Sequence, residues 1–136
     1  VVSELWTKLV YICALSGMTC ITNAPFSEVL DTPQTLDLTW RVLREAASVG
    51  RASGVSLGDA IVESTMDEFQ SSEEELTSSM HLDLQRGNRL EVGVLNGAVV
   101  RIGKDVGVET PVNEFITACL TVAHNRAAAG AVEQGR

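Results

Sequence analysis

Lys8 is a residue whose type and position relative to its apolar neighbours could support catalysis. It follows Leu5 by three residues and precedes Ile12 by four, so a helix over this stretch carries the ammonium group on an apolar face. A lysine in that position either extends its charged end to the margin of the face or meets a partner in a cleft. The first outcome is the commoner one. The second would make Lys8 a general acid that gives its proton to a reacting carbonyl group.

A second group of polar side chains lies in segment 78–97. Two adjacent hydroxyls, Ser78 and Ser79, precede a Gly-Asn bend, after which Glu91 heads an apolar-striped helix that also contains Asn96. Folded about the bend, the hydroxyls and the carboxylate would face one cleft. From spacing alone, helix caps and solvated side chains are the commoner explanation of such groups.

Composition excludes several classes of function. A net charge of −8 argues against a nucleic-acid surface, which needs an excess of Lys and Arg. Cys13, Cys20 and Cys119 lack the CxxC spacing of a zinc site and are odd in number, so we expect reduced thiols. His81 and His124 are too isolated to predict a metal site, and we expect both to be satisfied edge residues. No glycine-rich phosphate loop occurs in the sequence.

The uncharged stretch over residues 9–27 raises the question of a membrane span. Ser16, Gly17 and Pro25 interrupt it before it reaches spanning length, and no signal peptide is recognisable. We therefore expect a soluble, cytoplasmic protein without a membrane partner. The chain begins with Val1 rather than Met, which is compatible with a piece of a longer protein.

The elements that must position these residues are helices. Five N-terminal signals are Ser3-Glu4, Thr32-Pro33, Ser56 with Asp59, the capping-box form Ser72-Glu73-Glu74-Glu75, and Thr110-Pro111. Ser16-Gly17 is expected to loosen the first helix, leaving a short separate turn over 18–23. No segment alternates polar and apolar residues between hairpin turns, so the sequence predicts an all-α, multi-helix domain over 1–125 with a frayed tail at 126–136.

Four segments together resemble one family. They are LWTKL (5–9), SSMHLD (78–83), GNRLEVGVLNGAVVR (87–101) and GVETPVNE (107–114), in this order. The chain from Leu5 to about Val122 resembles the C-terminal domain of ketopantoate reductases, also called 2-dehydropantoate 2-reductases, NADPH-dependent enzymes of pantothenate biosynthesis. The resemblance implies an all-helical domain of the 6-phosphogluconate dehydrogenase C-terminal-like type. It also implies an N-terminal Rossmann domain, absent from this chain, with the active site between the two.

The resemblance also implies roles for individual residues. Lys8 matches the catalytic lysine that donates a proton to the substrate ketone, and Ser79 matches the serine that binds the substrate carboxylate. Glu91 matches the acidic residue that faces the cofactor. Ser78 and Asn23 are further candidates for substrate binding. No metal is implied, and NADPH is expected in the complete enzyme but not on this chain alone.

Two positions depart from the family pattern. Ile12 and Ser16 stand where members of the pantothenate pathway carry asparagines that hold polar groups of the substrate. The family is therefore better supported than ketopantoate itself as the substrate, and a small 2-keto acid is the expected substrate class. The expected partners are a Rossmann domain in cis or in trans and, to bury an uncovered face, a second copy of the chain.

A second hypothesis assigns no catalysis to the chain. It would be a stand-alone helical module for oligomerisation or interaction that keeps the motifs as folding determinants. Ser79 would then cap a helix, Glu91 would favour a helix N-terminus, and Lys8 would extend to solvent.

Overall fold

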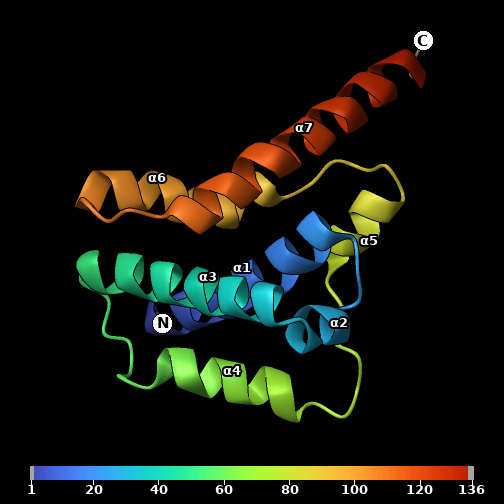
Figure 1. The fold of residues 1–136 in the computed structure, drawn as a ribbon. Helices are drawn as coiled ribbons and strands as arrows, with labels where there is room; N and C mark the ends of the chain where they lie inside the picture. The colour runs from blue at the N-terminus through green and yellow to red at the C-terminus, as the bar shows by residue number, and fades with distance from the viewer. Residues whose placement is uncertain (1, 135–136) are drawn as a thin grey trace.

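The computed structural model describes residues 2–134 of the chain as an assembly of helices (Figure 1). The elements are α1 (Val2–Thr22), α2 (Phe26–Asp31), α3 (Pro33–Ala52), α4 (Ile61–Ser71), α5 (Ser79–Gln85), the 3₁₀ turn η1 (Val92–Val94), α6 (Asn96–Val106) and α7 (Pro111–Gln134). The described residues contain no strand, which confirms the all-α prediction.

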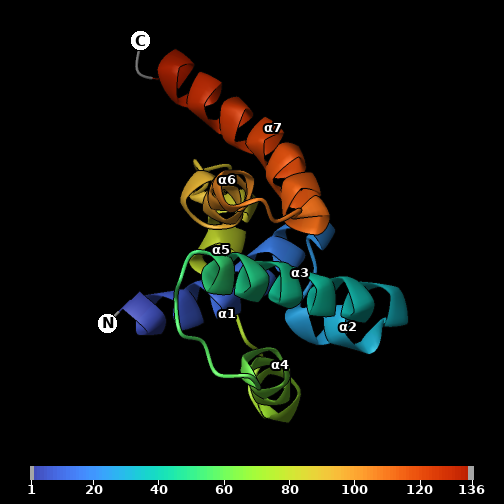
Figure 2. The ribbon, with the colours of Figure 1, turned by 90° about the vertical axis from the view of Figure 1, so that its left-hand side faces the viewer.

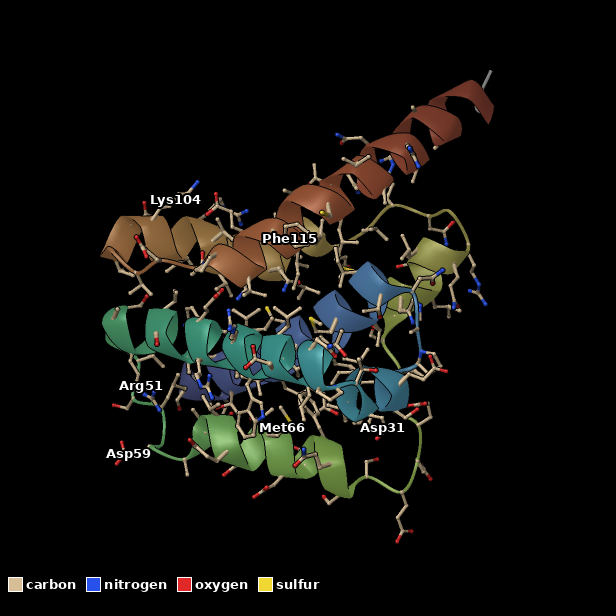
Figure 3. All side chains as sticks on the ribbon, viewed as in Figure 1. Asp31, Arg51, Asp59, Met66, Lys104 and Phe115 are labelled. Atoms are coloured by element: carbon tan, nitrogen blue, oxygen red, sulfur yellow. The ribbon has the colours of Figure 1, made fainter. Side chains whose placement is uncertain are left out.

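The helices form three layers (Figures 1 and 2). α1 and α3 pack against each other in the middle, α6 and α7 cover one side, and α4 covers the other. Met66 of α4 is fully buried and points toward the α1–α3 layer (Figure 3). α2 and α5 lie near the C-terminal end of α1. Because α1 contacts α2, α3, α5 and α7, its side chains supply the centre of the core.

The expected break at Ser16-Gly17 is wrong, because α1 continues unbroken to Thr22. Both residues are buried. A Cβ atom on Gly17 would lie 2.9 Å from Nδ2 of Asn96 and 3.3 Å from the Ile116 side chain. The glycine is therefore required by the close approach of α6 and α7, and not by a bend in α1.

α1 is long and apolar enough, by length and composition, to cross a membrane. Half of its apolar window is buried inside the protein, and the core helix of a soluble protein passes the same test. The length of the helix is accounted for by its central position among the other helices.

α1 ends in a left-handed residue. Asn23 has a φ of 50°, its N–H donates to the carbonyl of Cys20 at 3.3 Å, and the N–H of Ala24 donates to the carbonyl of Thr19 at 3.3 Å. These two bonds form the Schellman motif, in which glycine is the usual left-handed residue. Asparagine in that place closes the helix and adds an amide side chain at its end.

A further local prediction, the helix start at Ser72, differs from the structure. The acids after Ser72 do not open a helix, since α5 begins only at Ser79. Instead the Glu75 carboxylate accepts hydrogen bonds from the hydroxyl of Ser27 and, at 3.1 Å, from its N–H, at the start of α2. The sequence pattern could not show this because the donors belong to a segment 48 residues earlier.

The tail predicted to fray continues α7 as helix as far as Gln134. Its alanine-rich sequence has high helix propensity, which accounts for the continuation of α7. Residues 135–136 lie outside the described part of the chain. Fraying of residues 126–136 in solution stays a prediction.

Candidate functional site

Three of the predicted site residues lie in one pocket. Asn23, Ser78 and Ser79 line a cavity of about 540 Å³ between the C-terminal end of α1 and α5, together with Thr19 and His81. This volume is within the range of small-molecule sites in proteins. The structure thus gathers polar groups from segments more than fifty residues apart in sequence.

The two serines differ in what their hydroxyls do. Ser78 is buried and is the N-cap of α5, where its Oγ accepts a hydrogen bond of 3.1 Å from the N–H of His81. Ser79 is exposed, and its hydroxyl makes no hydrogen bond to another described residue. The cap proposed for Ser79 under the second hypothesis is therefore made by Ser78, which leaves the Ser79 hydroxyl available to a ligand.

Lys8 does not line this pocket. It lies on the face of α1 that continues through Ile12, Ser16 and Thr19 to Asn23, at intervals of three or four residues. Because a helix rises 1.5 Å per residue, Lys8 begins roughly 16 Å before Thr19 along the axis. The ammonium is exposed, and within the described chain it has no ion-pair partner. Lys8 and the pocket thus lie along the same side of α1, and Ser16 and Thr19 between them are buried.

Glu91 is likewise outside the pocket. It is exposed and is the N-cap of η1, where its carbonyl accepts from the N–H of Val94 at 3.1 Å. The preceding residue, Leu90, donates its N–H to Nδ1 of His124 on α7 at 3.0 Å. His124 therefore fixes the segment that presents Glu91, which agrees with the expectation that this histidine is satisfied.

His81 is the pocket residue that sequence reasoning missed. Its Nε2 lies 3.0 Å from Oδ1 of Asn23 and 3.4 Å from Nε2 of Gln85. The available signal was its position three residues after Ser78, since an N-cap side chain accepts from the residue three positions on. That spacing places the backbone N–H of His81 at the cap, whereas the position of the imidazole depends on packing against Asn23.

The sequence left a chemical role for Asn96 open. In the structure its side chain belongs to a buried polar network instead. Its Nδ2 donates to Oδ1 of Asn113 at 2.9 Å and to the carbonyl of Cys13 at 3.2 Å. Glu45 of α3 accepts from the N–H groups of Val112 and Asn113 at 3.0 and 2.9 Å, at the start of α7. The network joins α1, α3, α6 and α7 and so holds the layer that covers α1.

Covalent and metal chemistry have little support among the described residues. Burial raises the pKa of Cys13 to about 12, and burial with the nearby Asp83 carboxylate raises that of Cys20 to about 12. Such thiols stay protonated and are poor nucleophiles. The described residues contain no cluster of His, Cys, Asp or Glu able to hold a metal ion.

Residues 1–124 match the family model described as ketopantoate reductase PanE/ApbA C terminal. The chain belongs to the ketopantoate reductase family. The match covers the helices that form the pocket, so the predicted family and the helical C-terminal domain are confirmed. Members of the family are NAD(P)-dependent oxidoreductases.

Several relatives carry the name 2-dehydropantoate 2-reductase, and two of them show the extent of the match. The one from Archaeoglobus fulgidus is 33% identical over 114 residues, which are 83% of this chain and 37% of the relative. The one from Caulobacter vibrioides is 28% identical over 122 residues, or 90% of this chain and 41% of the relative. The chain thus spans about 40% of the length of these ketopantoate reductases.

The fold is also similar to solved structures of the family. The PanE/ApbA family ketopantoate reductase from Ralstonia eutropha JMP134 superposes with a TM-score of 0.83 at 28% identity. The match covers 93% of this chain and 42% of that one. The part of the Ralstonia structure that this chain resembles is therefore less than half of it.

Proposed function

We propose that this chain is the substrate-binding and catalytic half of a ketopantoate-reductase-like enzyme that reduces a 2-keto acid to a 2-hydroxy acid with NADPH. The observation that carries the proposal is the meeting of Asn23, Ser78 and Ser79 in one pocket at the end of the Lys8 face of α1. Family membership supports the class of reaction, and the pocket is where we expect the substrate of that reaction to bind.

Each polar group has a chemical task in this reaction. The exposed Ser79 hydroxyl donates to the substrate carboxylate and so orients the keto group toward α1. Lys8 gives its proton to the carbonyl oxygen as a hydride adds to the carbonyl carbon, so that one O–H and one C–H bond form and the C=O double bond is reduced. An ammonium beside the developing alkoxide also stabilises its charge.

NADPH, when bound, supplies the hydride. The described residues fit only part of this cofactor, because they contain no strand followed by a glycine loop to receive its phosphates. The exposed carboxylate of Glu91 is an acceptor for a hydroxyl or amide group and would repel a phosphate. We therefore assign the nucleotide to a Rossmann domain, in cis or in trans, and only the contact with Glu91 to this chain.

Substituting Lys8 tests the catalytic assignment. The chain is mixed with a Rossmann domain of the same family, and NADPH oxidation is followed with a panel of 2-keto acids. Lys8→Ala is expected to lower kcat by about 10²–10⁴-fold, the usual contribution of a positioned general acid. Lys104, the other lysine of the sequence, lies exposed on the outer side of α6 (Figure 3), and Lys104→Ala is the matched control with unchanged kcat. Equal turnover by the two variants would show that Lys8 is not the acid.

A second candidate function, self-association, has its own observation. Phe115, Ala118, Cys119 and Val122 lie on one exposed face of α7, where Phe115 is 63% and Val122 54% exposed. The segment 115–123 contains no charged residue. An apolar stripe of this kind on a surface helix is characteristic of a contact with another protein surface. We propose that a second copy of the chain covers it.

A further inference from the structure

Glu91 lies in a segment that has little packing of its own. The connection between α5 and α6, which carries Glu91, is irregular apart from η1 (Figure 1). Residues 86–89 are exposed, and a cavity of about 710 Å³ is lined both by residues 87–89 and by α7 between Ala123 and Ala131. Such a segment opens locally at a small cost in free energy unless separate contacts hold it. The position of Glu91 therefore depends on a few individual contacts.

Two side chains from other helices hold the backbone on either side of Glu91. Leu90, immediately before it, donates its N–H to Nδ1 of His124 on α7 at 3.0 Å. The carbonyl of Gly93, two residues after it, accepts from Nη1 of Arg101 on α6 at 2.8 Å. Segment 90–93 is thus tied to α7 before Glu91 and to α6 after it.

The bond to Leu90 defines what the His124 side chain must supply. A backbone N–H can only donate, so Nδ1 of His124 accepts and carries no proton. Leu90 is buried, and its N–H makes no other hydrogen bond within the described chain. An asparagine at position 124 would carry an acceptor oxygen on Cγ, the atom that bears Nδ1 in histidine, whereas a leucine would carry none.

We propose that His124 and Arg101 are positioning residues that act through Glu91 on the binding of the nicotinamide nucleotide. In this role neither side chain contacts the cofactor or the substrate. They hold segment 90–93 so that the Glu91 carboxylate is in place to accept from a hydroxyl or amide group of NADPH. This inference rests on the proposed function, because it takes Glu91 as the contact of this chain with the cofactor.

Amide hydrogen exchange, measured by NMR on the chain alone, tests the anchor at His124. His124→Leu is expected to speed exchange of the Leu90 amide at least about tenfold, because the N–H loses its acceptor. His124→Asn is expected to restore most of the protection. Asn125→Leu, a change at the exposed neighbouring position, is the control, and the amide of the buried Leu43 reports that each variant is folded. Unchanged exchange at Leu90 in a folded His124→Leu variant would overturn the inference.

Kinetics of the chain mixed with a Rossmann domain of the family test the action through Glu91. Glu91→Ala and His124→Leu are each expected to raise KM for NADPH by about five- to tenfold, the equilibrium factor of one hydrogen bond, with little change in kcat. Arg101→Met is expected to behave like His124→Leu, whereas His124→Asn and Asn125→Leu keep the KM of the unchanged chain.

The double variant Glu91→Ala/His124→Leu distinguishes positioning from an independent effect. If His124 acts through Glu91, the double variant has the same KM as Glu91→Ala alone. If the two effects multiply, His124 acts by another route and the inference is wrong.

The same kinetics separate this inference from the proposed function. If the unchanged pair shows no turnover that depends on Lys8, both proposals fail. If turnover depends on Lys8 but His124→Leu leaves KM for NADPH unchanged, the reaction class stands and only the role of His124 is wrong.

Discussion

Ser78 and Ser79 are neighbours of the same type with different surroundings. The hydroxyl of Ser78 completes the first turn of α5, whereas Ser79 lines the pocket and its hydroxyl has no partner among the described residues. We propose that these two identical side chains divide a structural and a binding task. The difference arises because the chain turns into the helix between them, so that only the first can reach back to the N–H of His81.

Alanine substitutions separate the two tasks. Ser78→Ala is expected to lower the free energy of unfolding by about 1 kcal/mol, the usual effect of losing an N-cap. Ser79→Ala is expected to leave it unchanged within about 0.5 kcal/mol and to weaken 2-keto acid binding. Urea denaturation followed by circular dichroism measures the first quantity, and NMR titration the second. A destabilised Ser79→Ala with normal binding would favour a purely structural role for the motif.

At the scale of helices, α1 shows how packing overrides local propensity. Gly17 lowers the intrinsic helicity of α1, yet the helix passes through it because α6 and α7 pack against this stretch. The proposed function depends on this continuity, since Lys8 and Asn23 lie on the same side of α1 only if the helix does not break between them.

Two glycines give opposite expectations for the change to alanine. In Gly17→Ala the new Cβ would lie 2.9 Å from Nδ2 of Asn96, and we expect a loss of about 1–3 kcal/mol in the free energy of unfolding from overpacking. In Gly130→Ala on α7 a Cβ would meet nothing within 4 Å, and the better helix propensity of alanine is expected to stabilise by up to about 1 kcal/mol. Thermal and urea unfolding of both variants provides the measurement. Stabilisation by both would mean that Gly17 is not held by packing.

At the scale of the whole molecule, the chain presents two unpartnered surfaces. One is the pocket at Ser79, and Lys8 and Glu91 are exposed outside it; we propose that the substrate and a Rossmann domain bind to these groups. The other is the apolar stripe of α7, whose first residue, Phe115, borders a pocket shared with α1 and α3. A helical domain of this size can bury its own core and still need other surfaces for its function.

Phe115→Glu tests the second surface. A charge within an apolar contact is expected to raise the Kd for self-association by at least about tenfold, because burying it without a partner is costly. Thr121→Glu, exposed on another face of α7, should have no effect. Sedimentation equilibrium of the three proteins gives the association constants. If the unchanged chain is a monomer at every concentration tested, a second copy does not cover the stripe.

The sequence by itself determined the helical class, the cap-plus-proline starts of α3 and α7, and the family. These features depend on residue spacing within a few helical turns or on motifs that can be recognised directly in the sequence. The sequence did not determine that α1 runs unbroken past Gly17, that Glu75 binds Ser27, or that His81 meets Asn23.

Each of those features joins residues far apart in sequence. The partner of His81 is 58 positions away, and that of Glu75 is 48. No local pattern encodes such a contact, because it depends on how helices pack and on which donors remain free once they have packed. The pocket is therefore a product of the tertiary structure: α1 and α5 supply its residues, and only their packing brings Ser79, Asn23 and His81 to one place.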